Sequence, residues 1–285
     1  MTARRAGRRF EQAWEYLCHF EPKPGSYVRH NLKRFLLTID WLPKRQARVL
    51  DLGSDRHFAL LLAKERPGYD ISCVNLRVAR GAPADAGHIH EVSGTESRRL
   101  GCATVDVEHD ALPWDAESVD IVLCLELIEH LLADPVHMVL EIHRVLKPGG
   151  ALLLTTPNML SWRHILNAVG GIYPMEHMKY HRSLGCTQHV REYSPWEIRQ
   201  LLEEAGFRLE RLRTFEVTRT RRLNLLERTL AAALTAAVPL MGRHPKFMLH
   251  RHPKIFALCR KNGVPKENAG RFLYIESQNG APLDV

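Results

Sequence analysis

Short apolar runs and segments of helical periodicity alternate through the middle of the chain. The apolar runs occupy residues 49–52, 71–74, 103–105, 118–124 and 151–155. Between them, residues 58–63 and 135–145 carry apolar spacing or start and stop signals typical of helices. Strands that are apolar on both faces are typical of a parallel sheet covered by helices. The pattern therefore predicts an α/β fold with a doubly wound, mostly parallel sheet.

The flanking segments add helices and complete the sheet. Residues 10–20 and 26–39 have helical spacing, and Ser26 is the predicted N-cap of the second helix. Farther along the chain, the sequence predicts helices at 162–169, 195–205 and 223–241 and strands at 208–217 and 254–260. With these two strands, we expect a Rossmann-like, seven-stranded sheet with right-handed crossovers.

We expect three regions in the chain. Residues 1–45 form an N-terminal helical cap, residues 46–218 the core, and residues 219–285 a helix and strand that complete the core. Two stretches lack clear periodicity. Residues 77–100, rich in Gly, Ala, Pro and Ser, are predicted to be a connection, and residues 170–188 an irregular, His-rich insert or lid.

Composition narrows the class of protein. The chain has 285 residues, no run of about 18 apolar residues and no apolar segment after its N-terminal arginines, so we expect neither a membrane span nor a signal peptide. Its six cysteines form no Cys-x-x-Cys pair, and Cys73 and Cys124 fall in predicted strands. These features favour reduced, buried thiols in a cytoplasmic protein.

The net charge of +8 would suit an anionic partner, but much of it lies near residues 4–9 and 219–222, outside the central pattern. Arginines flank the Ala- and Leu-rich segment 223–241. Such a helix could make weak peripheral membrane contact, or it could pack on the sheet or on a second copy in a homodimer, which we consider the better interpretation.

A strand, a glycine turn and a helix follow one another from Arg48 to Leu61. The apolar run 49–52 leads to Gly53, and the helical segment begins soon after it. This arrangement is how an open α/β sheet presents a nucleotide site at the end of its first strand. Backbone N–H groups at the start of the helix could bind an anionic group there, such as a carboxylate.

Further motifs follow in a fixed order. They are DVEHDALPW at 106–114, LELIEHL at 125–131, EIHRVLKPGG at 141–150, TTPN at 155–158, HVREYS at 189–194 and EAGF at 204–207. From residue 49 to 207, the chain resembles the class I S-adenosylmethionine-dependent methyltransferases, particularly bacterial enzymes that methylate surface glycans and small molecules.

The resemblance implies that S-adenosylmethionine is the cofactor. The implied cofactor-binding residues are Asp51, Gly53 and Ser54 at the methionine end, Asn75 at the ribose, Asp106 and Val107 at the adenine, and Leu125 and Glu126 beside the sulfonium. A carboxylate at Asp106 can accept a hydrogen bond from the adenine amino group, and Gly53 lets the backbone approach the ligand.

The chain departs from the family pattern at three positions. Asp55 and His57 stand where the family usually has glycines, and Asn75 stands where an acidic residue usually binds the ribose. If the site is functional, the side chains of Asp55 and His57 must turn away from the cofactor. Otherwise the chain is a catalytically degenerate member that acts as a regulatory or partner subunit.

A hydroxyl acceptor needs a base, and histidine suits that role near neutral pH. His130 follows the fourth predicted strand, and His189 belongs to the HVREYS motif, so both are candidate catalytic residues. Each could equally make a structural hydrogen bond. We expect Glu192 and Tyr193 to hold the lid segment in place rather than react.

We expect no metal site from the sequence. His177, His181 and His189 could suggest one, but their intervals match no zinc-site spacing and Cys186 stands alone.

The sequence thus predicts O-methylation of a sugar, a glycolipid or a related small molecule. The basic charge raises the alternative of a nucleic-acid acceptor. The chain has neither the Asn/Asp-Pro-Pro-aromatic tetrapeptide nor a catalytic Pro-Cys pair, and it has no recognisable nucleic-acid-binding module, which argues against that alternative.

Overall fold

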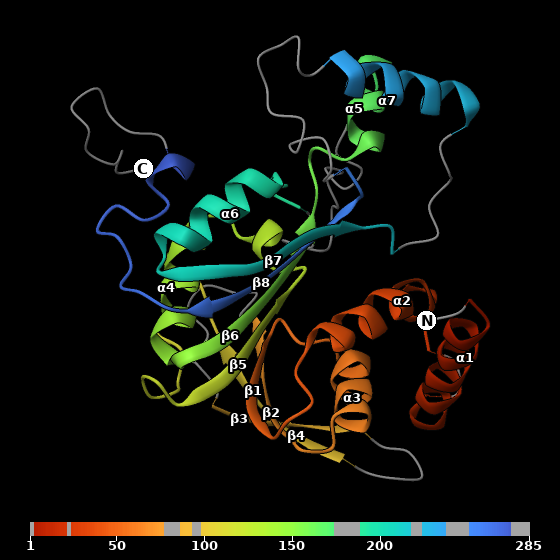
Figure 1. Cartoon of the computed structure of the whole chain (residues 1–285). Helices are drawn as coiled ribbons and strands as arrows, with labels where there is room; N and C mark the ends of the chain where they lie inside the picture. Colours follow the sequence, from red (N-terminus) through yellow and green to blue (C-terminus); the bar gives the residue numbers. More distant parts are fainter. Residues whose placement is uncertain are drawn as a thin grey trace, which may run out of the picture.

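The fold is an eight-stranded sheet with helices on both faces (Figure 1). The computed structural model describes residues 3–21, 24–76, 86–92, 98–173, 189–217, 224–237 and 251–274. The strands are β1 (Ala47–Leu52), β2 (Tyr69–Leu76), β3 (Ala86–Val92), β4 (Arg98–Val105), β5 (Val119–Leu125), β6 (Leu146–Pro157), β7 (Phe207–Phe215) and β8 (Lys254–Lys261).

The strand order is β3-β4-β2-β1-β5-β6-β8-β7. The five strands from β4 to β6 pair in parallel, whereas β3, β8 and β7 pair antiparallel with their neighbours. The chain runs outward from β1 in one direction to β2 and β4, and in the other to β5 and β6. The carboxyl ends of these parallel strands therefore meet beside β1, where open α/β sheets form their ligand crevice.

This architecture confirms the predicted fold class. The seven expected strands form one continuous sheet from β4 to β7. The prediction of a connection over residues 77–100 was wrong in part, because β3 and the first residues of β4 lie within it. Hydrogen bonds between the backbones of these two strands form whatever the side chains are. An edge strand that contains a glycine and two histidines, as β3 does, therefore gives little signal in the sequence.

Two hydrophobic clusters hold the layers together. The first joins one face of the sheet to α1 (Ala3–Phe20), α2 (Ser26–Trp41) and α3 (Arg56–Glu65). The second joins the other face to α4 (Pro135–Val145) and α6 (Pro195–Glu204). The short helix η1 (Ile128–His130) follows β5, and Ile128 is buried in the second cluster.

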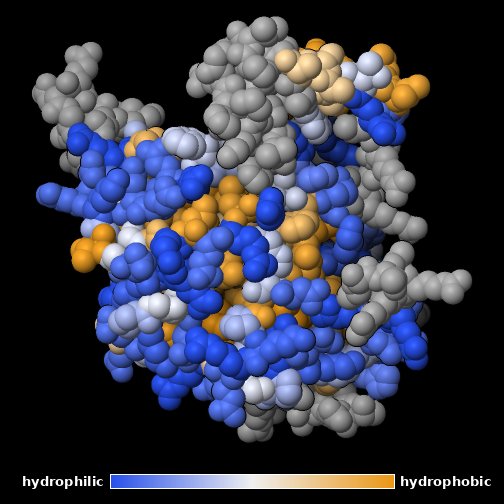
Figure 2. Space-filling view, viewed as in Figure 1, coloured by the Kyte–Doolittle hydropathy of each residue, from blue (hydrophilic) through white to orange (hydrophobic). Residues whose placement is uncertain are grey.

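Helix α7 (Leu225–Ala237) lies beside α5 (Trp162–Val169) at the top of Figure 1. Leu225 and Leu226 are 80% and 77% exposed, and this apolar surface is visible at the upper right of Figure 2. The sheet therefore does not cover the first turn of this helix, and the expected alternative of packing on a second copy stays a prediction. No helix among the described residues is long and apolar enough to cross a membrane.

Capping residues fix several helix starts. Ser194 and Glu197 form the predicted capping box of α6, in which each side chain accepts from the backbone N–H of the other. The predicted cap of α2 was wrong: Gly25 occupies the N-cap position without a side-chain bond, and Ser26 is already helical.

The thiols of Cys73 and Cys124 are buried and free, as predicted. Burial raises the pKa of the Cys73 thiol to about 12. A neutral thiol in this setting behaves as a small apolar side chain.

Gly206, which follows the C-cap residue Ala205 of α6, allows a stability prediction. Its φ is 83°, and an added Cβ would lie 2.8 Å from the carbonyl oxygen of Gly263. Because strain and a backbone clash add, Gly206→Ala should lower the free energy of unfolding by about 3 kcal/mol in urea denaturation. The matched control is Gly149→Ala, where φ is 73° and nothing lies within 4 Å of the added Cβ. It should lose about 1 kcal/mol. Equal losses would exclude the clash as a cause.

Candidate functional site

The sheet brings the expected site residues to one edge. The N–H group of Gly53 donates to the carbonyl oxygen of Val74 at 2.8 Å, which joins the turn after β1 to the end of β2. Since β2 alone separates β1 from β4, the ends of β1 and β4 lie about 10 Å apart. A ligand of nucleoside size can therefore reach from Gly53 to Asp106, which follows β4.

Gly53 is required by its geometry. Its φ is 67°, and an added Cβ would lie 3.3 Å from Cδ1 of Leu127. Any other residue would be strained and would narrow the space beside the turn.

Asp51 places a carboxylate deep in the same edge. It is 1% exposed, and its side chain accepts a hydrogen bond of 2.8 Å from the Ser54 hydroxyl. Burial raises the pKa of Asp51 to about 7, and the Ser54 hydrogen bond offsets only part of that effect. A ligand cation beside Asp51 would favour its ionised form, so the position suits an ammonium group.

Asp55 and His57 have structural partners of their own. Asp55 is the N-cap of α3, where Oδ1 accepts from the N–H groups of His57 at 2.8 Å and Phe58 at 3.1 Å. The φ of Asp55 is −88°, so no glycine is needed there. The His57 ring contacts Glu21 on the segment after α1, with 2.9 Å between Nε2 and Oε2.

This cap corrects one expectation. The first N–H groups of α3 were expected to bind an anionic ligand group, but Asp55 already accepts from two of them. The negative end of a ligand at this edge therefore needs a different positive partner.

Arg34, which the sequence did not single out, can supply that charge. It lies on α2, is 3% exposed and donates to Asn31 Oδ1 at 3.1 Å and to the Tyr27 hydroxyl at 3.4 Å. Among the described residues it forms no ion pair, although it lies close enough to Asp51 and Glu126 to favour their charged forms. A buried guanidinium with neutral partners suits a carboxylate ligand.

The residues expected at the ribose and at the adenine also lie at this edge. Asn75 is in β2 one residue beyond Val74, and Asp106 and the buried Val107 follow β4 directly. The carboxylate of Asp106 accepts from the N–H group of Glu108 at 3.1 Å and contacts Nδ1 of His109 at 3.2 Å. Its side chain stays 23% exposed, so it can accept a further hydrogen bond from a ligand.

Glu126, after Leu125 at the end of β5, has a φ of 55° and forms an ion pair with Lys254 of β8. Burial raises the pKa of Glu126, but the charges of Lys254 and Arg34 outweigh it and lower that pKa overall. The negative charge of Glu126 is therefore largely neutralised by Lys254. Its Oε1 is buried and has no hydrogen-bond partner among the described residues.

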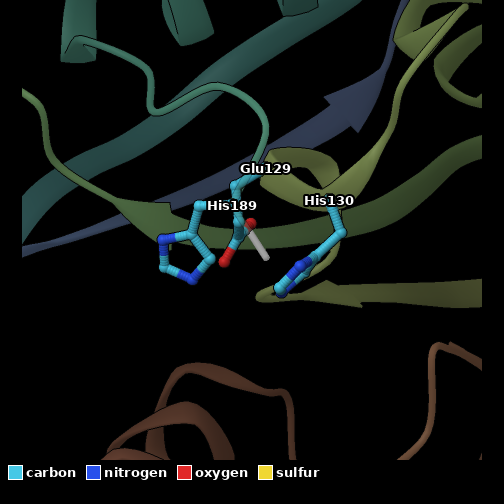
Figure 3. Close-up of side chains that lie close together, drawn as sticks. All are labelled: Glu129, His130 and His189. Atoms are coloured by element: carbon cyan, nitrogen blue, oxygen red, sulfur yellow. The ribbon is translucent and has the colours of Figure 1, made fainter. Parts of the chain in front are cut away.

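Glu129, His130 and His189 converge beyond the end of β5 (Figure 3). Glu129 and His130 come from η1, and His189 comes from the segment before α6. The rings of His130 and His189 meet edge to face, with centroids 5.0 Å apart. The structure thus brings the two candidate catalytic histidines together. Burial and the charge of Glu126 both raise the pKa of Glu129.

The segment that carries His189 is tied to η1 by its backbone. The N–H group of Val190 donates to the carbonyl oxygen of Glu129 at 2.7 Å. Glu192 is 7% exposed, and its Oε1 lies 3.0 Å from Nδ1 of His189. The carbonyl oxygen of Tyr193 accepts a hydrogen bond of 3.0 Å from the N–H group of Met159. Glu192 and Tyr193 therefore hold the segment in place.

A family model described as a methyltransferase domain matches residues 13–212 of the chain. A probable S-adenosylmethionine-dependent methyltransferase of Mycolicibacterium smegmatis is 36% identical over 37% of this chain and 36% of the relative. A ubiquinone biosynthesis O-methyltransferase of Idiomarina loihiensis is 28% identical over 56% of this chain and 60% of the relative. The match thus spans less than two thirds of either relative.

Among solved structures, a SAM-dependent methyltransferase from Archaeoglobus fulgidus is similar to this chain. It has a TM-score of 0.48 and 17% identity, over 86% of this chain and 99% of that one.

The cap formed by Asp55 gives a second stability prediction. Asp55→Ala removes the acceptor of two helix N–H groups and should lower the free energy of unfolding by about 1 kcal/mol in urea denaturation. Asp115→Ala is the control, since Asp115 is exposed and caps no helix, and it should change stability by less than about 0.5 kcal/mol. Equal stability of wild type and Asp55→Ala would contradict the capping role.

Proposed function

Because the chain belongs to the class I S-adenosylmethionine-dependent methyltransferase family, we propose that it transfers a methyl group from S-adenosylmethionine to an oxygen of a small-molecule acceptor. The observation that carries the proposal is the pair of buried opposite charges, Asp51 and Arg34, beside the glycine turn after β1. Together they complement the ammonium and carboxylate groups of an amino acid.

The residues present fit this cofactor. Asp51 would hold the ammonium group and Arg34 the carboxylate, while Gly53 leaves room where a side chain would intrude. Asn75 would hydrogen-bond the ribose hydroxyls as a neutral amide, and Asp106 would accept from the adenine amino group. When bound, S-adenosylmethionine supplies an electrophilic methyl group on a sulfonium.

The acceptor oxygen belongs next to Glu126, where β5 ends and the histidine cluster begins. His130 and His189 meet there, so an imidazole can take the proton of an acceptor hydroxyl. The neighbouring Glu126–Lys254 ion pair provides polarity without a net charge that would hold a cationic acceptor.

The names of the relatives favour an oxygen acceptor in a small molecule, since several are ubiquinone biosynthesis O-methyltransferases. Neither these relatives nor the one from Mycolicibacterium smegmatis is named for a sugar or glycolipid acceptor. We therefore favour a phenolic hydroxyl over the sugar hydroxyl expected from the sequence.

A catalytically degenerate, regulatory protein is the alternative. The replacement of the usual glycines by Asp55 and His57 suggests this alternative. Each of the two residues has a structural role, however, and the glycine turn at residue 53 is intact. Retention of buried binding charges without a ligand would be costly, which favours the enzyme.

The proposal includes a cytoplasmic location, supported by the free, buried cysteines. The exposed leucines of α7 support a surface contact with a second copy or with a membrane surface.

Methyl transfer tests the proposal directly. Purified protein is incubated with methyl-labelled S-adenosylmethionine and catechol, a hexose or an oligonucleotide as acceptor. We expect labelled product with catechol and S-adenosylhomocysteine in equal amount. Binding of S-adenosylhomocysteine without transfer to any acceptor of the three classes would favour the degenerate alternative.

Arg34 should contribute strongly to cofactor affinity. Arg34→Met removes the guanidinium but keeps an apolar stem, and it should raise the Kd for S-adenosylhomocysteine by about 10- to 100-fold in calorimetry, because a charge-assisted pair is lost. Lys33→Met is the matched control, since Lys33 is the exposed neighbour on α2. An unchanged Kd for Arg34→Met would place the ligand carboxylate elsewhere.

Asp51 should make cofactor affinity pH-dependent. Its pKa near 7 means that a rise in pH from 6 to 8 converts most of the population to the carboxylate that binds an ammonium group. The Kd for S-adenosylhomocysteine should therefore fall about tenfold over that range.

Two variants identify the titrating group. Asp51→Asn should bind weakly with a flat profile, whereas Glu129→Gln should keep the pH dependence. A flat wild-type profile would contradict the role of Asp51.

A further inference from the structure

The cluster of Glu129, His130 and His189 has the composition of a metal site. One potential ligand atom from each side chain lies within 4.8 Å of the others. In Figure 3 the carboxylate of Glu129 stands between the two imidazole rings. No other group of three such side chains lies this close together among the described residues.

An unsatisfied buried oxygen points to a ligand at this cluster. Glu129 is fully buried, and its Oε2 accepts a hydrogen bond of 3.0 Å from the Thr156 hydroxyl. Its Oε1 has no hydrogen-bond partner in the described part of the chain. A buried carboxylate oxygen without a partner is costly, and a cation is one group that would satisfy it.

A carboxylate holds the ring of His189 in the way that carboxylates hold metal-bound histidines. Its Nδ1 lies 3.0 Å from Oε1 of Glu192, whose side chain is 2% exposed. A carboxylate on one ring nitrogen leaves the opposite nitrogen, Nε2, directed away from it. This carboxylate–histidine arrangement is characteristic of metal ligands.

The backbone also positions the cluster before any ion binds. Glu129 and His130 are adjacent in η1, and the carbonyl oxygen of Glu129 accepts from the N–H groups of Val190 at 2.7 Å and Arg191 at 3.2 Å. Two elements about 60 residues apart in sequence are thereby fixed to each other at the cluster.

We propose that Glu129, His130 and His189 bind one divalent transition-metal ion of the Zn²⁺ type. Two imidazoles and one carboxylate are a ligand set of catalytic zinc sites, which keep a further position open for water or substrate. Ligand atoms in a tetrahedral zinc site are about 3.3 Å apart, so side-chain adjustment of about 1.5 Å or less closes the cluster. Imidazole ligands disfavour Mg²⁺, which prefers oxygen.

Glu126 is not part of the ligand set. Its carboxylate forms an ion pair with Lys254, which supplies a positive charge from within the protein. The site is therefore three-coordinate from the protein side, and the acceptor can complete it.

This inference rests on the proposed function and gives the cluster a more specific role. A hydroxyl oxygen bound to the ion has a lowered pKa, as metal-bound water has, and its proton passes to solvent water. His130 and His189 then act as ligands rather than as bases. The spacing of His177, His181 and His189 in the sequence predicts no metal site, and the first two of these residues lie outside the described part of the chain. The approach of His189 to Glu129 and His130 depends on the fold and cannot be seen in the spacing.

Cobalt substitution tests the site. Full-length protein treated with a chelator is titrated with Co²⁺ and followed by its visible absorption, and Zn²⁺ is then added to displace the cobalt. We expect one Co²⁺ per chain, with bands typical of four or five ligands, and full displacement by Zn²⁺.

Variants locate the ion. Glu129→Gln, His130→Asn and His189→Asn should each weaken Co²⁺ binding by about 100-fold or more, and Glu192→Gln by about 10- to 100-fold. The matched control is His19→Asn, at an exposed histidine of α1, which should bind as wild type does. If Glu129→Gln fails to fold, the two histidine variants decide the question.

The outcomes separate the two proposals. Absence of one-to-one binding, or equal binding by wild type and the three ligand variants, overturns the metal site. S-adenosylhomocysteine titrated in the presence of chelator tests the proposed function independently, since Asp51 and Arg34 do not contact the cluster ion. Cofactor binding without Co²⁺ binding would leave the methyltransferase proposal standing alone.

Discussion

The balance of buried charge at the carboxyl edge of the sheet is the constraint on which the candidate site depends. The carboxylates of Asp51, Glu126 and Glu129 lie at or behind that edge, away from bulk water. Lys254 neutralises Glu126 directly, and Arg34 lies near Asp51 and Glu126 without forming an ion pair with either. Buried charges are tolerated when they are paired, so an edge that leaves Arg34 and Asp51 incompletely paired favours a ligand with charges of both signs.

The fold assembles this balance from distant parts of the chain. Asp51 is the second-to-last residue of β1, Arg34 comes from a helix that precedes the sheet, and Lys254 begins β8. The reversal of strand order beside β1 brings the carboxyl ends together, and the hydrogen bond from Gly53 to Val74 fixes the turn between them. The same geometry places the Glu129 cluster beyond β5, next to the expected position of the reacting methyl group.

The sequence predicts the parts of this site that depend on local patterns. Asp51 lies near the end of an apolar run, and Gly53 and Asp106 follow such runs, so their positions at strand ends could be inferred from the chain alone. Asp55 also carries a local signal, since an aspartate directly before a helix is a typical N-cap. Arg34 and Lys254 could not be inferred, because their roles depend on contacts across the fold. The same holds for His189 and Glu129, whose approach depends on backbone hydrogen bonds between remote segments.

A crystal structure of the protein with S-adenosylhomocysteine tests the central claim most directly. The charge balance predicts the ligand's ammonium group at the Asp51 carboxylate and its carboxylate within hydrogen-bond distance of the Arg34 guanidinium, with Asp55 still capping α3. A ligand carboxylate bound to the first N–H groups of α3, with Asp55 displaced and Arg34 uninvolved, would contradict the account.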